Sequence, residues 1–114
     1  MSIVVEHRIY LLKAEHMPAV YLEAYERLGL PAQLEILGPN SLLGYYVTEI
    51  GLQNEFTHLW GFQDLEDRRR RRAALRADPR WQECLQVIRP MLESLTSKIM
   101  YPASFSPLQE LPGS

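Results

Sequence analysis

The stretch that decides the fold is IVVEHRIYLLK, residues 3–13. Its β-branched and aromatic residues are typical of a β-strand, in which successive side chains point to opposite faces. Apolar residues occupy both the odd and the even positions of this stretch. We therefore expect both faces of the strand to be covered, one by helices of the same chain and the other by a second subunit.

Helix and turn signals follow this strand. Pro18 fits the first turn of a helix and Gly29 its C-cap, and residues 31–38 can add a further helical turn. Residues 42–50 and 55–62 have the composition of strands, and the short Gly-containing segment between them predicts a β-hairpin.

The second half of the chain contains two further helices and a strand. Asp64 can cap a helix, with Asp67 in the position of a capping-box acid, and this helix is expected to end near Asp78. Pro79 can begin the next helix, and residues 95–101 predict the last strand.

The resulting order is β-α-β-β-α-β, the ferredoxin-like plan of the α+β class, with an antiparallel sheet and helices on one face. We expect a single domain over residues 1–114, with residues 102–114 as a Pro/Ser-rich C-terminal tail. The apolar sheet face that the helices leave bare favours a homodimer.

Charge argues against a nucleic-acid partner. The chain has 12 Lys and Arg against 14 Asp and Glu, a formal net charge of -2, although five arginines stand in a row at residues 68–72. Proteins that bind nucleic acids usually carry a basic excess, because counterion release supplies much of their affinity.

The sequence also lacks the marks of a membrane, secreted or cofactor-bearing protein. No apolar run approaches the roughly 18 residues of a membrane span, and Glu6 and Arg8 interrupt the segment where a secretory signal would be apolar. Cys84 is the only cysteine, the three histidines are scattered, and no nucleotide-binding motif is present. We expect a soluble cytoplasmic protein with no membrane partner, no metal and no cofactor.

The arginine run can be divided by helical spacing. Arg68 and Arg72 share a face with Leu75, whereas Arg70 and Arg71 are expected to be solvated. In the simpler interpretation these arginines cover apolar surface and pair with nearby acids. In the functional interpretation an inward guanidinium of Arg68 or Arg72 binds an anionic or enolate-like ligand.

Two strands carry further candidates. Glu6, Arg8 and Tyr10 alternate onto one face of the first strand, where they could bind a ligand, donate a proton and stabilise an oxyanion, or form a satisfied polar network. On the third strand, Trp60 could stack on a ligand and His58 could act as a general base, or both could belong to the core. These residues suggest a cavity bounded by the first strand, the third strand and the arginine-rich helix, provided that the two strands turn these side chains to the same sheet face.

Several segments together resemble the NIPSNAP family. In chain order they are VEHRIYLLK (5–13), LLGYYVTEIG (42–51), THLWGF (57–62), DRRRRRAALRADPRW (67–81) and YPASFSP (101–107). The resemblance implies a dimeric α/β barrel in which two ferredoxin-like sheets pack face to face. Because the wider superfamily includes cofactor-free monooxygenases, isomerases and binding modules, the fold alone does not choose a reaction.

The function expected from these observations is that of a homodimeric α/β-barrel protein that binds a small organic molecule. Transformation of that molecule without a metal or a nucleotide stays open, with His58 and Tyr10 as the candidate catalytic residues. The alternative is a non-catalytic scaffold or sensor module. The two differ in whether a solvent-accessible pocket lined by more than one titratable group exists.

Overall fold

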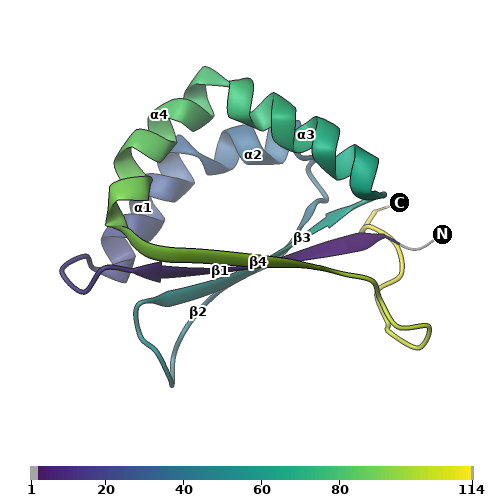
Figure 1. Ribbon diagram of the computed structural model, residues 1–114, viewed down its shortest axis with the longest axis horizontal. Coiled ribbons are helices and arrows are strands. Elements are labelled where there is room, and N and C mark those ends of the chain that lie inside the picture. The colour runs from purple at the N-terminus through teal and green to yellow at the C-terminus, as the bar shows by residue number, and fades with distance from the viewer. Residues whose placement is uncertain (1–2, 114) are drawn as a thin grey trace.

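The chain folds into one antiparallel sheet with helices on one of its faces (Figure 1). This is seen in a computed structural model that describes residues 3–113. The elements, in chain order, are β1 (Val4–Leu12), α1 (Pro18–Leu28), α2 (Leu30–Ile36), β2 (Leu42–Val47), β3 (Glu55–Phe62), α3 (Leu65–Ala77), α4 (Pro79–Ile88), the short 3-10 helix η1 (Arg89–Met91) and β4 (Leu92–Met100).

The sheet has the strand order β2-β3-β1-β4, with β1 between β3 and β4. All three strand pairs are antiparallel, which confirms the predicted ferredoxin-like plan. The helices α1 to α4 lie together on one face of the sheet (Figure 1).

Strand register brings the polar candidates onto the same face. Glu6 lies opposite Trp60 and Arg8 lies opposite His58 in the β1–β3 pair, and directly opposed residues share a sheet face. Because Glu6, His58 and Trp60 are all buried within this single chain, that face is the one covered by the helices. The question left open by the sequence, whether the two strands present these residues to the same side, is thereby answered.

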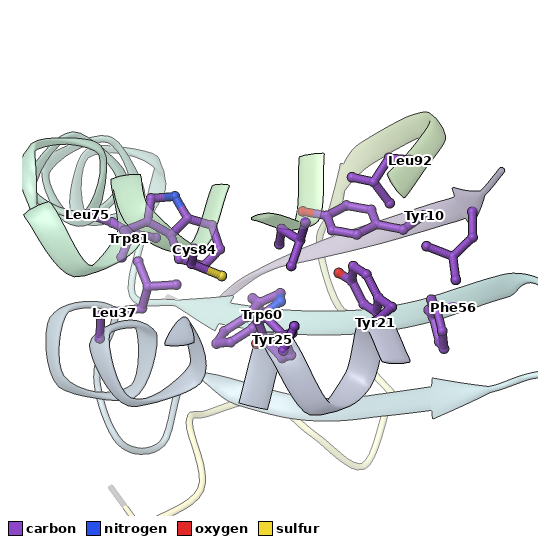
Figure 2. Close-up of a cluster of buried hydrophobic side chains, with 14 of the residues drawn as sticks. Tyr10, Tyr21, Tyr25, Leu37, Phe56, Trp60, Leu75, Trp81, Cys84 and Leu92 are labelled. Atoms are coloured by element: carbon purple, nitrogen blue, oxygen red, sulfur yellow. The ribbon is translucent and has the colours of Figure 1, made fainter. Parts of the chain in front are cut away.

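The core between sheet and helices is rich in aromatic residues (Figure 2). Trp81 and Cys84 of α4 pack against Gly29, which ends α1. Gly29 has the C-cap position expected from the sequence, but its φ of -112° is right-handed, so the turn itself does not require glycine. A Cβ there would lie 2.6 Å from Cys84 Sγ and 2.8 Å from Trp81 Cζ3, so the close approach of α1 and α4 requires it.

Several predicted boundaries differ from the structure. The last strand begins at Leu92 rather than at residue 95, because η1 leads directly into pairing with β1, where Leu12 lies opposite Leu92. The strand predicted over residues 42–50 ends at Val47. Asp64 caps α3 by accepting the backbone N–H of Asp67 at 2.7 Å, as expected, but the Asp67 carboxylate accepts the N–H of Gln63 instead of that of Asp64.

The opposite sheet face carries no helix (Figure 1). The odd-numbered residues of β1 lie on it, and Val5, His7 and Ile9 are only partly buried. Part of the C-terminal tail folds against one end of this face, where Leu111 contacts Gly61. Within residues 3–113, no helix has the length and apolar composition to cross a membrane.

Candidate functional site

An ion-pair network is centred on Glu6, whose side chain is completely buried. One carboxylate oxygen, Oε2, accepts Nη1 of Arg8 and Nη2 of Arg68, each at 2.9 Å, and Oε1 accepts Nε of Arg68 at 3.2 Å. Burial raises the pKa of Glu6, but the hydrogen bond from Arg68 and the charges of Arg8 and Arg72 outweigh burial and hold the pKa below its ordinary value. Glu6 is therefore ionised and both of its oxygens are occupied.

The other edge of the Arg8 guanidinium holds Tyr10. Nε and Nη2 of Arg8 donate to the Tyr10 hydroxyl oxygen at 3.1 and 2.9 Å. Because this oxygen already accepts two N–H groups, the phenolic proton must point away from Arg8. Tyr10 is thus positioned to donate a hydrogen bond to a third group.

His58 is fixed by its neighbours. Its Nδ1 accepts the indole N–H of Trp60 at 2.7 Å, and its ring stacks on Tyr45 with centroids 4.3 Å apart. Burial and, next, the charge of Arg8 lower the pKa of His58 to about 3, so the ring is neutral. A neutral ring whose Nδ1 is an acceptor carries its proton on Nε2, and this buried atom has no partner among the described residues. No lone pair is then free for the general-base role considered from the sequence.

Three residues of the arginine run form ion pairs around α3. Arg69 pairs with Glu66 at 2.6 Å, and Arg70 and Arg71 pair with Asp67 at 3.2 and 2.7 Å. The Arg70 side chain is 64% exposed, as helical spacing predicts. Arg71 is less exposed than expected, at 38%, because it also donates to the Ile36 carbonyl at the end of α2.

Arg72 differs from the rest of the run. Its side chain lies beside Arg8 and Glu6, yet within residues 3–113 its guanidinium has neither a hydrogen bond nor an ion pair. Burial and, next, the charge of Arg8 lower the pKa of Arg72. Arg72 is therefore a partly buried cation that no carboxylate of the described residues contacts directly, although the charge of Glu6 lies nearby.

A cavity of about 400 Å³ lies beside Arg72, between β1, β4, α3 and α4. It is lined by Arg8, Tyr10, Arg72, Arg76, Trp81, Leu85, Ile88, Arg89, Leu92 and Leu95. The lining thus combines four arginines and a phenol with apolar side chains, and it contains no carboxylate.

The structure separates the predicted site residues into three groups. Arg8, Tyr10 and Arg72 line this cavity, whereas Glu6 and Arg68 form the ion pair beside it. Trp60 and His58 do not line it and are packed in the core at 1% and 2% exposure. The cavity is bounded by β4 instead of β3, since β1 has a neighbour on each side.

Sequence reasoning missed the cavity residues on α4 and β4. Trp81, Leu85 and Ile88 have the helical spacing of an apolar stripe, but this spacing alone does not distinguish a face packed in the core from a cavity wall. Arg76, one helical turn beyond Arg72, could have been found by extending the same face. Among the described residues, no group of three His, Cys, Asp or Glu side chains is placed to hold a metal ion.

Comparison with known proteins places this fold in context. Over 94% of each chain, the protein superposes on a crystal structure of a NIPSNAP family protein of unknown function from Agrobacterium tumefaciens, with 47% sequence identity and a TM-score of 0.86. It also superposes on a cofactor-independent oxygenase from Streptomyces nogalater over 94% of this chain and 99% of the other, with a TM-score of 0.64. At 12% identity, this second similarity concerns the fold alone.

Sequence comparison gives the family. The zebrafish (Danio rerio) NipSnap homolog 1 is 33% identical over 70 residues, a match that spans 61% of this chain but only 25% of the homolog. The NIPSNAP family model matches residues 5–107, which include the cavity described above and all four strands except the first residue of β1. The chain belongs to the NIPSNAP family.

Proposed function

We propose that this protein binds a small organic molecule in the cavity between β1, β4, α3 and α4. The observation that carries the proposal is the meeting of Arg8, Tyr10 and Arg72 with an apolar wall around one space of about 400 Å³. Sites for small molecules usually measure roughly 300–1,000 Å³ and combine apolar walls with a few convergent polar groups.

Three larger hollows lack this combination. One, of about 450 Å³, lies at the end of β1, where its charged residues are the oppositely charged Lys13 and Glu93. A second, of about 550 Å³, lies between α1 and β2, where its charged residues are Glu23 and Glu26. The third, of about 570 Å³, lies on the helix-free sheet face beside the C-terminal tail, and no charged residue lines it. The cavity next to Arg72 is therefore the favoured binding site.

We also propose that the protein is a homodimer whose subunits pack through their helix-free sheet faces. Val5 and Leu59 lie on that face together with Ile9, so a single chain leaves apolar surface in water. A second copy would cover this surface and leave the Arg72 cavity open, because that cavity lies on the opposite side of the sheet.

Chemistry at the cavity is an extension of the binding proposal. Tyr10 supplies a proton donor held by Arg8, and Arg72 can stabilise negative charge that develops on a ligand. The alternative is a scaffold or sensor without catalysis, in which ligand occupancy changes only stability or association.

A cavity-filling variant tests the binding site. A library of small organic molecules is screened by thermal shift against wild type, Leu85→Trp and Val87→Trp. Leu85 lines the cavity, whereas Val87 lies on the same helix, is 39% exposed and does not line it. Compounds that bind in the cavity should raise Tm of wild type and Val87→Trp but not of Leu85→Trp. Hits that bind Leu85→Trp equally well would place binding elsewhere, and a library without hits would favour the scaffold alternative.

Light scattering after size-exclusion chromatography tests the dimer. Wild type should have about twice the chain mass of 13.2 kDa. Ile9→Asp places a charge in the centre of the helix-free face and should give a monomer. Glu23→Lys, at an exposed position of α1, should not change the mass. A monomeric wild type at micromolar concentration would contradict the proposed interface.

A further inference from the structure

Charges around the Arg72 cavity do not balance. Glu6 is the carboxylate beside it, and the guanidinium groups of Arg8 and Arg68 already occupy both of its oxygens. Within residues 3–113, Arg72, Arg76 and Arg89 form no ion pair with any acid. An empty cavity would keep these cations together at the cost of mutual repulsion, whereas a bound anion would offset it.

The cavity also changes character along β1. At one end Arg8 lies opposite Ser97 of β4, two residues further along Tyr10 lies opposite Leu95, and after another two Leu12 lies opposite Leu92. With a rise of about 3.3 Å per residue, the polar and apolar ends are separated by roughly 13 Å. Trp81, Leu85 and Ile88 of α4 extend the apolar wall above the sheet. An elongated ligand with one charged end fits this gradient.

We propose that the ligand is an organic carboxylate with an apolar body. This inference rests on the proposed binding function and specifies its ligand class. The carboxylate pairs with the fork of Arg72, none of whose five N–H groups is used by another described residue, and accepts a hydrogen bond from the hydroxyl of Tyr10. The apolar body lies along Trp81, Leu85 and Ile88.

The donor geometry favours a single carboxylate over a more highly charged head group. Arg8 donates three of its N–H groups to Glu6 and Tyr10, so Arg72 is the guanidinium with the most N–H groups left for a ligand. A planar carboxylate can accept two parallel hydrogen bonds from such a guanidinium. Arg76 and Arg89 are exposed and therefore act at longer range, by attracting anions to the cavity entrance.

Calorimetric titration with three straight-chain molecules of eight carbons tests the ligand class. The probes are octanoate, octanol and octylamine, which have the same number of carbons and differ in the charge and chemistry of the head. Wild type should bind octanoate at least about tenfold more tightly than octanol, and octylamine more weakly than either, because the cavity presents cations without free acids.

Substitutions within the arginine run locate the effect. Arg72→Gln should weaken octanoate about tenfold or more and leave octanol unchanged. Arg70→Gln, a control from the same run whose side chain is 64% exposed and does not line the cavity, should bind as wild type does. Tyr10→Phe should weaken octanoate but not octanol.

The results separate this inference from the proposal on which it rests. If wild type bound octanoate and octanol equally and Arg72→Gln changed neither affinity, the carboxylate assignment would be overturned. The Leu85→Trp variant would still show whether molecules bind in the cavity. Equal losses in Arg72→Gln and Arg70→Gln would also overturn the carboxylate assignment, because they would indicate long-range attraction instead of a contact. If Leu85→Trp bound octanoate as tightly as wild type, the cavity would not be the binding site.

Discussion

On the helix-covered side of β1, Glu6, Arg8 and Tyr10 are joined by hydrogen bonds of 2.9 to 3.1 Å. On the other side, His7 makes no side-chain hydrogen bond among the described residues, and Ile9 presents only apolar atoms. Neighbouring residues of one strand therefore meet opposite conditions. The helix side holds charges in fixed geometry away from water, and the helix-free side offers partly apolar surface. This difference between the two faces is the basis for proposing a ligand on the first face and a second subunit on the other.

Among substitutions on the two faces of β1, the largest loss of stability is expected at Glu6. Glu6→Gln removes the buried negative charge that holds Arg8 and Arg68 and leaves them beside Arg72. Loss of one partner from a buried ion pair costs about 3–5 kcal/mol, so the free energy of unfolding in urea should fall by about 3 kcal/mol.

A carboxylate on the opposite face is the matched control. Glu55 lies opposite Leu11 on the helix-free side and forms no ion pair within residues 3–113. Glu55→Gln should change the free energy of unfolding by less than about 0.5 kcal/mol. Similar losses in the two variants would show that the charge network does not distinguish the faces.

The next largest loss of stability is expected from alanine substitutions at two glycines. A Cβ on Gly29 would meet Cys84 and Trp81 in the packed core, whereas a Cβ on Gly61 would meet the side-chain end of Leu111 at 2.6 Å, in the C-terminal tail. Gly29→Ala should therefore cost about 1–3 kcal/mol by overpacking, and Gly61→Ala should cost clearly less because Leu111 can move. Chemical denaturation of both variants measures the difference, and a reversed order would show that the tail is held more firmly than α1 and α4.

A pH-dependent effect is expected at His58. Because its pKa is about 3 in the folded protein and ordinarily 6.5, the unfolded chain takes up a proton between these values that the folded chain does not. The free energy of unfolding should thus fall as pH drops below 6.5, by about 2 kcal/mol near pH 5, before Glu6 contributes.

Substitutions at two histidines assign this pH dependence. His58→Asn retains an acceptor for the Trp60 N–H but cannot titrate, so it should flatten the stability profile from pH 6.5 to about 5. His7→Asn on the helix-free face should keep the wild-type profile. A wild-type slope in His58→Asn would mean that another group takes up the proton.

The smallest effect is expected at Arg72, and its sign is informative. Arg72→Met keeps most of the apolar stem and removes a partly buried charge that forms no ion pair and is repelled by Arg8, so stability should stay equal or rise by up to about 1 kcal/mol. Arg70→Met, which loses only an exposed ion pair with Asp67, should stay within about 0.5 kcal/mol of wild type. A loss of more than about 1 kcal/mol in Arg72→Met would indicate that Arg72 stabilises the fold and is not reserved for a ligand.

Much of the fold could be predicted because its signals are local. Alternation in residues 3–13, the cap at Asp64 and the prolines that begin helices each act within a few residues. The last strand was predicted to begin three residues too late, because its first residues are set by the pairing of Leu92 with Leu12 of β1 and not by a local pattern.

The site was only partly accessible to sequence reasoning, because it depends on contacts between distant segments. The shared face of Arg8 and His58 follows from the β1–β3 register, which no single strand specifies. The position of the cavity depends on how α4 and β4 pack beside β1. A helical wheel likewise could not show that Arg71 reaches the end of α2.

Because α1 and α4 approach closely at Gly29, the reactivity of Cys84 can be used to measure how often these two helices separate. Cys84 is the only cysteine in the sequence, it is fully buried beneath this contact, and burial raises the pKa of its thiol to about 11. A thiol reagent at neutral pH can therefore modify it only after the two helices separate. The labelling rate of Cys84, measured by mass spectrometry without denaturant, should give the free energy of that local separation, and a ligand in the neighbouring cavity should slow it.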